Sequence, residues 1–162
     1  MLYKKIMFFS FLLVMLLGFN GPSMADDFAG VTAAKVVWNV TTGDEKVFLD
    51  RMDLIQQTAD SLKKRGIKPD FVVIIHGPAA KFVAKDLKDT KFAKDKLPKL
   101  KQAHSSLESL THNGVPVEVC AIALKRAKIA HSNVRDFAVI QDNVFENLIV
   151  LQNKGYAYMA VN

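Results

Sequence analysis

The amino-acid sequence predicts an α/β fold: a doubly wound, mainly parallel sheet of about five strands with helices on both faces. Strand-like and helix-like patterns alternate along the chain, which favours parallel strands joined by right-handed crossovers. Residues 71–75 form a continuous apolar run without polar alternation, as expected for a strand buried on both faces. The length of 162 residues, with 50% hydrophobic residues, fits one such domain and leaves no room for two ordinary ones.

The first half of the predicted domain is a strand–helix–strand unit. Residues 35–40 form a short β-branched run, and the turn that follows ends in Asp44, a suitable helix N-cap. Apolar residues recur every three or four positions over 45–62, and the Lys-Lys-Arg-Gly sequence ending at Gly66 places cations and a glycine at the helix end. Residues 70–75 then supply the central strand.

A lysine-rich segment follows at residues 81–101. It holds eight lysines against three aspartates, a local charge of +5, and its apolar residues are spaced for a core. We expect a first short helix with a solvated basic face, then a second helix that Pro98 opens and that ends at Asn113-Gly114. The alternative is an anion-binding or membrane-surface patch. The segment has no arginine, so we expect no nucleic-acid partner.

The second half of the domain continues the alternation. The predicted elements are a strand at 115–119, a helix at 121–128, a strand at 137–140, a helix at about 143–151 and a strand at 156–161. Cys120 therefore lies between the end of a strand and the start of a helix.

Residues 1–25 have the pattern of a cleavable secretory signal peptide. Lys4-Lys5 precedes the apolar run 6–18, and Ser23-Met24-Ala25 is a small-x-small cleavage site. The apolar run is shorter than the ~20 residues of a membrane-spanning helix, and an uncleaved anchor is the alternative. We expect a periplasmic protein in which residues 26–162 form a single domain, with no stable membrane insertion after cleavage.

Composition excludes several classes of site. A single cysteine cannot form an intrachain disulfide, a cysteine-rich zinc site or the ligand set of an iron–sulfur cluster. His104, His112 and His131 do not recur at metal-ligand spacings, so no metal is predicted. G-x-S-x-G, Walker and strand-linked G-x-G-x-x-G motifs are missing from the sequence, which leaves hydrolase and nucleotide-binding functions without support. We expect no cofactor.

Cys120 is the most informative candidate residue. Open α/β sheets bind ligands at the carboxyl ends of their strands, and a thiol between a strand end and a helix start meets unpaired helix amides that stabilise a thiolate. The alternative is a small buried apolar residue, which is common for a free cysteine.

The same edge of the sheet supplies further candidates. Asn39, Thr41 and Thr42 lie at the end of the first strand, and His76 and Gly77 follow the second. His76 is a candidate to orient or protonate a group held by Cys120, or is a hydrogen-bonded histidine at a strand end. Arg126, on the helix after Cys120, is a candidate to stabilise a thiolate or bind an anionic sulfur substrate, or is a solvated cation.

Three segments resemble the DsrE/DsrF-like family, in particular its small exported members. They are Val119-Cys-Ala-Ile-Ala-Leu-Lys-Arg126, Val72-Val-Ile-Ile-His-Gly-Pro-Ala79 and Leu151-Gln-Asn-Lys-Gly-Tyr-Ala-Tyr158. The resemblance implies a compact α/β fold that assembles into trimers or hexamers. In the sulfur-relay members a cysteine at the position of Cys120 carries a persulfide.

Two hypotheses follow for the function. In the first, the protein is an exported sulfur carrier or sulfur-transfer protein with a persulfide on Cys120, a homo-oligomer that exchanges sulfur with a donor or acceptor protein. In the second, it is a non-catalytic ligand-binding or assembly module in which Cys120 is structural. Accessibility of the Cys120 thiol discriminates between them.

Overall fold

The structure is a computed structural model that describes residues 27–162. The predicted signal peptide at 1–25 lies outside these residues. Residues 31–162 form one compact unit. Across residues 27–162, no helix has the length and apolar character needed to cross a lipid bilayer.

The unit is built on one parallel sheet of five strands in the order β4-β3-β2-β1-β5. The strands are β1 (Ala33–Val40), β2 (Lys68–Ile75), β3 (Val117–Cys120), β4 (Ala138–Gln141) and β5 (Ala157–Val161). In β2, residues 71–75 are all buried, which confirms the central strand that the apolar run predicted. The edge strand β5 is exposed over most of its length.

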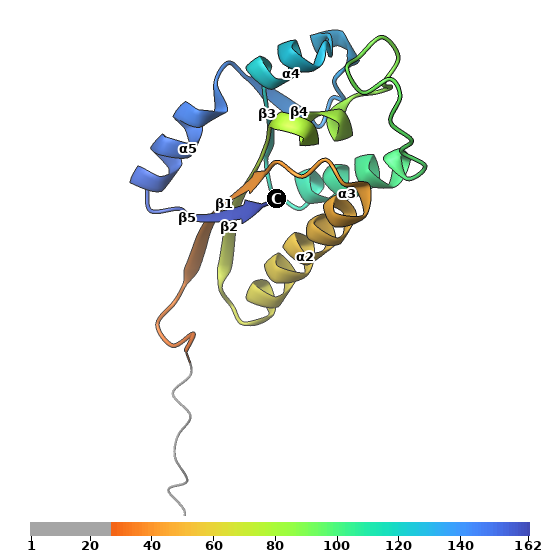
Figure 1. Cartoon of the computed structure of the whole chain (residues 1–162). Helices are drawn as coiled ribbons and strands as arrows, with labels where there is room; N and C mark the ends of the chain where they lie inside the picture. Colours follow the sequence, from red (N-terminus) through yellow and green to blue (C-terminus); the bar gives the residue numbers. More distant parts are fainter. Residues whose placement is uncertain (1–26) are drawn as a thin grey trace, which may run out of the picture. The chain divides into compact units, whose positions relative to one another are not determined.

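The helices cover the two faces unequally. They are α2 (Glu45–Lys64), α3 (Leu100–His112), α4 (Ala121–Ala127) and α5 (Val144–Asn153), with the 3-10 helices η1 (Gly77–Val83) and η2 (His131–Asn133). The chain steps from β1 towards β4 through α2, α3 and α4 and then returns to β5 through α5, which places α5 on the opposite face. Figure 1 shows α2 and α3 together on one side of the sheet and α5 on the other. This confirms the doubly wound α/β fold.

Most predicted elements are found within two residues of their expected bounds. The N-cap at Asp44 is confirmed, since its carboxylate accepts a hydrogen bond of 2.8 Å from the Val47 amide. Asn143 caps α5 in the same way through the Phe145 amide. Both caps satisfy amides that the first turn of a helix leaves unpaired.

The lysine-rich segment does not form the predicted short helix. The 3-10 helix η1 ends at Val83, and residues 84–99 are irregular until α3 begins at Leu100. Distant groups take the amides that a helix would use: the Lys85 amide donates to the Asn133 carbonyl and the Lys91 amide to the Ala127 carbonyl. Side chains within the segment also bond its backbone, which competes with helix formation.

The prediction of a solvated basic face is also wrong at one position. The lysines at 85, 88, 91, 94, 96, 99 and 101 are exposed, but Lys81 is buried. Its ammonium pairs with Asp95 at 2.6 Å and lies 5.5 Å from the Phe82 ring and 5.4 Å from the Phe92 ring. The predicted core spacing is confirmed, because Phe82 is fully buried and Phe92 packs against the core.

Candidate functional site

A cavity of about 230 Å³ lies at the carboxyl ends of β2 and β3. Its walls come from the β2–η1 junction, the irregular segment 84–99, β3, α4 and the start of α5. The residues that line it are His76, Gly77, Pro78, Lys91, Phe92, Cys120, Ile122, Ala123, Arg126, Ala127 and Phe145. This is the edge at which parallel α/β sheets bind ligands.

Cys120 is the last residue of β3 and the N-cap residue of α4. Its side chain is in the reduced form and the residue exposes only 2% of its surface, although it lines the cavity. A reagent therefore has to enter the cavity to reach the sulfur.

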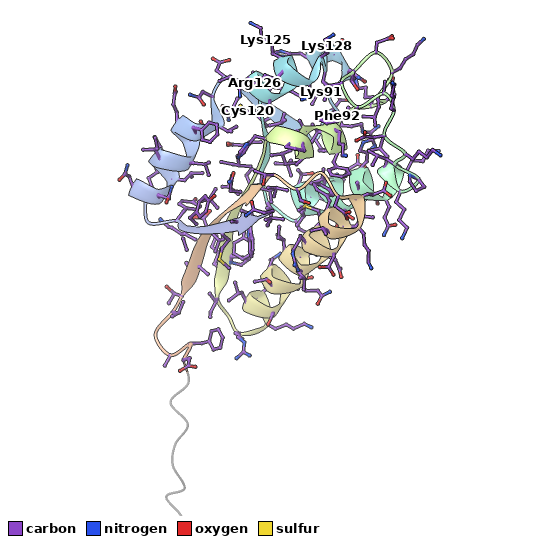
Figure 2. All side chains as sticks on the ribbon, viewed as in Figure 1. Lys91, Phe92, Cys120, Lys125, Arg126 and Lys128 are labelled. Atoms are coloured by element: carbon purple, nitrogen blue, oxygen red, sulfur yellow. The ribbon has the colours of Figure 1, made fainter. Side chains whose placement is uncertain are left out.

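Two cations share the cavity with Cys120. Arg126 projects from α4, one to two turns after the cysteine, and Lys91 comes from the irregular segment. Figure 2 shows both near Cys120 at the end of the domain that carries α4, with Phe92 beside Lys91 and with Lys125 and Lys128 on the same helix end. Positive charge beside a thiol favours its thiolate form and attracts anionic reactants.

The Lys81–Asp95 ion pair holds the wall that carries Lys91. Asp95 belongs to the irregular segment, whereas Lys81 belongs to η1 and is anchored in the core. The Lys91 amide also bonds the Ala127 carbonyl at 2.8 Å, which ties this wall to the end of α4. The position of Lys91 thus depends on two long-range contacts.

His76 lines the cavity and also contacts a residue of the neighbouring strand β1. Its Nε2 is 2.9 Å from Asn39 Oδ1, and the Asn39 amide nitrogen donates to the Tyr158 hydroxyl at 2.8 Å. The Phe145 ring packs on the imidazole with centroids 5.0 Å apart. Burial lowers the pKa of His76 below 6.5, so the imidazole is neutral near pH 7.

The structure brings four of the predicted site residues together in one cavity. Cys120, His76, Gly77 and Arg126 line the same cavity. Gly77 has φ +58°, a left-handed conformation that favours glycine and lets the chain turn out of β2 into η1. Thr41 is not among the lining residues, since its hydroxyl bonds Asn162 Oδ1 at 2.8 Å and so contacts the C-terminus instead.

Sequence reasoning missed three residues at this site. Lys91 and Phe92 belong to the segment predicted as a solvated helix, and their place in the cavity wall depends on contacts with α4 and η1. For Phe145, the helical spacing predicts only a place on the apolar face of a helix. Its position two residues after the N-cap Asn143, at the carboxyl edge of the sheet, is the signal that could have found it.

Residues 27–162 bring together no group of three or more histidine, cysteine or carboxylate side chains that is suited to a metal ion. The arrangement instead offers a thiol nucleophile, a neutral imidazole base and two cations around a small, partly aromatic cavity. Attack by Cys120 on an anionic or polarisable electrophile is the chemistry that this set allows.

Comparison with known proteins agrees with the resemblance. The family model of the DsrE/DsrF-like family matches residues 36–161, and the chain belongs to this family. The family implies a fold related to sulfur relay.

Two similar proteins carry names that assign them no activity. An uncharacterized protein of Aquifex aeolicus (strain VF5) is 36% identical over 126 residues, which are 77% of this chain but 55% of that protein. The chain thus spans about half the length of that relative. The solved structure of the protein of unknown function MTH1491 from Methanobacterium thermoautotrophicum has a TM-score of 0.61 at 14% identity and covers 78% of this chain and 98% of its own. This second likeness shows the fold alone.

Proposed function

We propose that the protein carries sulfane sulfur as a persulfide on Cys120. The observation that carries this proposal is that Cys120 shares one cavity with the Lys91 and Arg126 cations and with the neutral His76. These groups meet the needs of a thiolate that attacks an anionic sulfur compound. Membership of a family whose fold is related to sulfur relay agrees with it.

The loading step conserves atoms and electrons. The Cys120 thiolate attacks the outer sulfur of a persulfide R–S–SH, a new S–S bond forms on Cys120, and the original S–S bond breaks to release R–S⁻. The transferred sulfur keeps its oxidation state, so the step needs no external oxidant or reductant. Delivery is the same step in reverse, towards the thiolate of an acceptor protein.

Mass spectrometry tests the carrier role. The reduced protein is treated with sodium polysulfide, and we expect one increment of about +32 Da, one sulfur atom, on Cys120. Cys120→Ser, of nearly equal size, keeps the fold and loses the increment. A folded wild-type protein that takes up no sulfur would contradict the proposal.

The role of the cavity cation has a matched control on the same helix. Arg126→Gln removes a charge from the cavity, whereas Lys125→Gln removes one that lies outside its lining. We expect Arg126→Gln to slow polysulfide loading about tenfold, which corresponds to ~1.4 kcal/mol, and Lys125→Gln to slow it much less. Equal effects of the two variants would assign the acceleration to general surface charge.

One observation favours a second function. Cys120 belongs to the buried core and exposes 2% of its surface, as a purely structural cysteine does. In that case the protein is a ligand-binding or assembly module. Native protein would then resist both iodoacetamide and polysulfide, yet label fully in denaturant.

Export is a further proposal, supported by the N-terminal sequence pattern. It predicts that protein purified from its native compartment begins at Asp26 or within a few residues of it. N-terminal sequencing decides this, and intact Met1 in a membrane fraction would contradict it.

We also propose that the protein is a homo-oligomer. Large apolar side chains are exposed along α5 and the edge strands: Val139, Phe145, Ile149, Val150, Tyr158 and Met159. Burial of some of these side chains by a second copy removes apolar surface from water. Light scattering at micromolar concentration should give the mass of a trimer or hexamer for the wild-type protein. Ile149→Lys should shift this mass towards that of the monomer. A monomeric wild-type protein would overturn the homo-oligomer proposal.

A further inference from the structure

A hydrogen-bonded series of side chains leads from the edge strand β5 to the cavity. Asn39, near the end of β1, is 6% exposed and sits between two partners. Its amide nitrogen donates to Tyr158 Oη at 2.8 Å, and its carbonyl oxygen lies 2.9 Å from His76 Nε2. A carbonyl oxygen only accepts hydrogen bonds, so Nε2 carries the hydrogen in this arrangement.

This contact determines where the imidazole can act. A neutral imidazole with its hydrogen on Nε2 has a free lone pair on Nδ1, and only Nδ1 remains to exchange a proton with the cavity. The Phe145 ring, 5.0 Å away and inclined at 59°, packs against the imidazole and restricts its rotation. His76 and Cys120 line the same cavity.

We propose that Asn39 is a positioning residue: it holds His76 as the Nε2–H tautomer, so that Nδ1 is the base for the Cys120 thiol. This inference rests on the proposed function. The proton leaves Cys120 Sγ for His76 Nδ1, which gives a thiolate and an imidazolium with Nε2–H still bonded to Asn39. After the thiolate attacks a persulfide, the same proton passes to the departing R–S⁻ and restores neutral His76.

The groups around His76 favour a proton transfer that is brief and reversible. Lys91 and Arg126 line the cavity with it, Cys120 is the acid, and the Tyr158 phenol is linked to it through Asn39. The two cations stabilise the thiolate product and disfavour a lasting imidazolium. Burial, which lowers the pKa of His76, acts in the same sense. A base that returns its proton readily suits reversible sulfur transfer.

The tautomer is measured directly by long-range ¹H–¹⁵N NMR on histidine-labelled protein near neutral pH. His104 is an internal reference, because its Nε2 bonds the backbone carbonyl of Ala84 at 2.9 Å and must carry the hydrogen. We expect His76 to show the same Nε2–H pattern as His104. An Nδ1–H pattern at His76 in the wild-type protein would overturn the inference, whatever the sulfur-loading result.

Three variants then test the consequence for Cys120. Asn39→Leu removes both hydrogen bonds of Asn39, so the two neutral tautomers of His76 should both be populated. We expect sulfur loading to slow about tenfold, which is less than the ~10²-fold or more that loss of a general base costs. Asn39→Asp keeps the acceptor and should retain the Nε2–H tautomer while moving the pH profile of loading upward, since a carboxylate raises the pKa of His76. Thr41→Ala, the control, removes a hydroxyl at the end of β1 that does not line the cavity, and should keep the tautomer and load within about twofold of wild type.

The outcomes separate the two proposals. An Nε2–H His76 with unchanged loading and pH profile in Asn39→Leu and Asn39→Asp would overturn the positioning role while leaving the carrier intact. If Asn39→Leu fails to fold, the wild-type tautomer and the isosteric Asn39→Asp still decide. Wild-type protein that takes up no sulfur overturns both roles at Cys120.

Discussion

Removal of the Asp95 carboxylate tests how strongly the irregular wall of the cavity is held. The Asp95→Ala variant leaves the Lys81 ammonium, whose side chain is 9% exposed, without its partner at 2.6 Å. Breaking a buried pair costs ~3–5 kcal/mol, and an exposed pair is worth ~0–1 kcal/mol. Because the Asp95 side chain is 37% exposed and water can partly replace it, we expect a loss of about 2–3 kcal/mol.

Urea denaturation with a double-mutant cycle measures this loss. Lys81→Met places an apolar side chain between Phe82 and Phe92, so that variant and the double variant with Asp95→Ala should lie within about 1 kcal/mol of wild type. The control is Asp50→Ala, which breaks the exposed Asp50–Arg51 pair and should change the free energy of unfolding by less than about 1 kcal/mol. An Asp95→Ala effect no larger than that of Asp50→Ala would refute the reasoning.

Three further substitutions test contacts outside the ion pair. Burial lowers the pKa of His104 below 6.5, so the unfolded protein binds more protons at this residue than the folded protein as the pH falls. The contribution of neutral His104 to the free energy of unfolding is complete above about pH 6.5 and declines below it. Urea midpoints between about pH 7.5 and 5 should therefore fall less in His104→Gln than in wild type. Tyr156→Phe removes the 2.8 Å hydrogen bond from the phenol to Asp70 and should lower the free energy of unfolding by about 1–2 kcal/mol, whereas an unchanged midpoint in urea would mean that water replaces the phenol without cost. Gly43→Ala places a Cβ 2.8 Å from Pro78 Cβ and should cost about 1–3 kcal/mol in thermal or urea unfolding, unless the turn shifts freely.

Local sequence patterns were enough to predict the α/β alternation and the edge of the sheet at which the candidate site lies. The uninterrupted apolar run of β2, the capped helix after Asp44 and the strand–cysteine–helix order around Cys120 are all encoded within short windows. Such patterns report burial and helix ends reliably because the residues involved are neighbours in the chain. The positions of Cys120, His76 and Arg126 relative to the strand ends therefore follow from the sequence pattern.

The surroundings of these residues depend on contacts between distant parts of the chain. The lysine-rich segment has the composition of a solvated helix, but the Asn133 and Ala127 carbonyls take its amides and bring Lys91 to the cavity. Lys81 is buried because Asp95, fourteen positions along the chain, neutralises it. The contact between Asn39 and His76 spans 37 positions. Hydrogen bonds and ion pairs over such separations depend on how the strands are ordered in the sheet, which local periodicity does not encode.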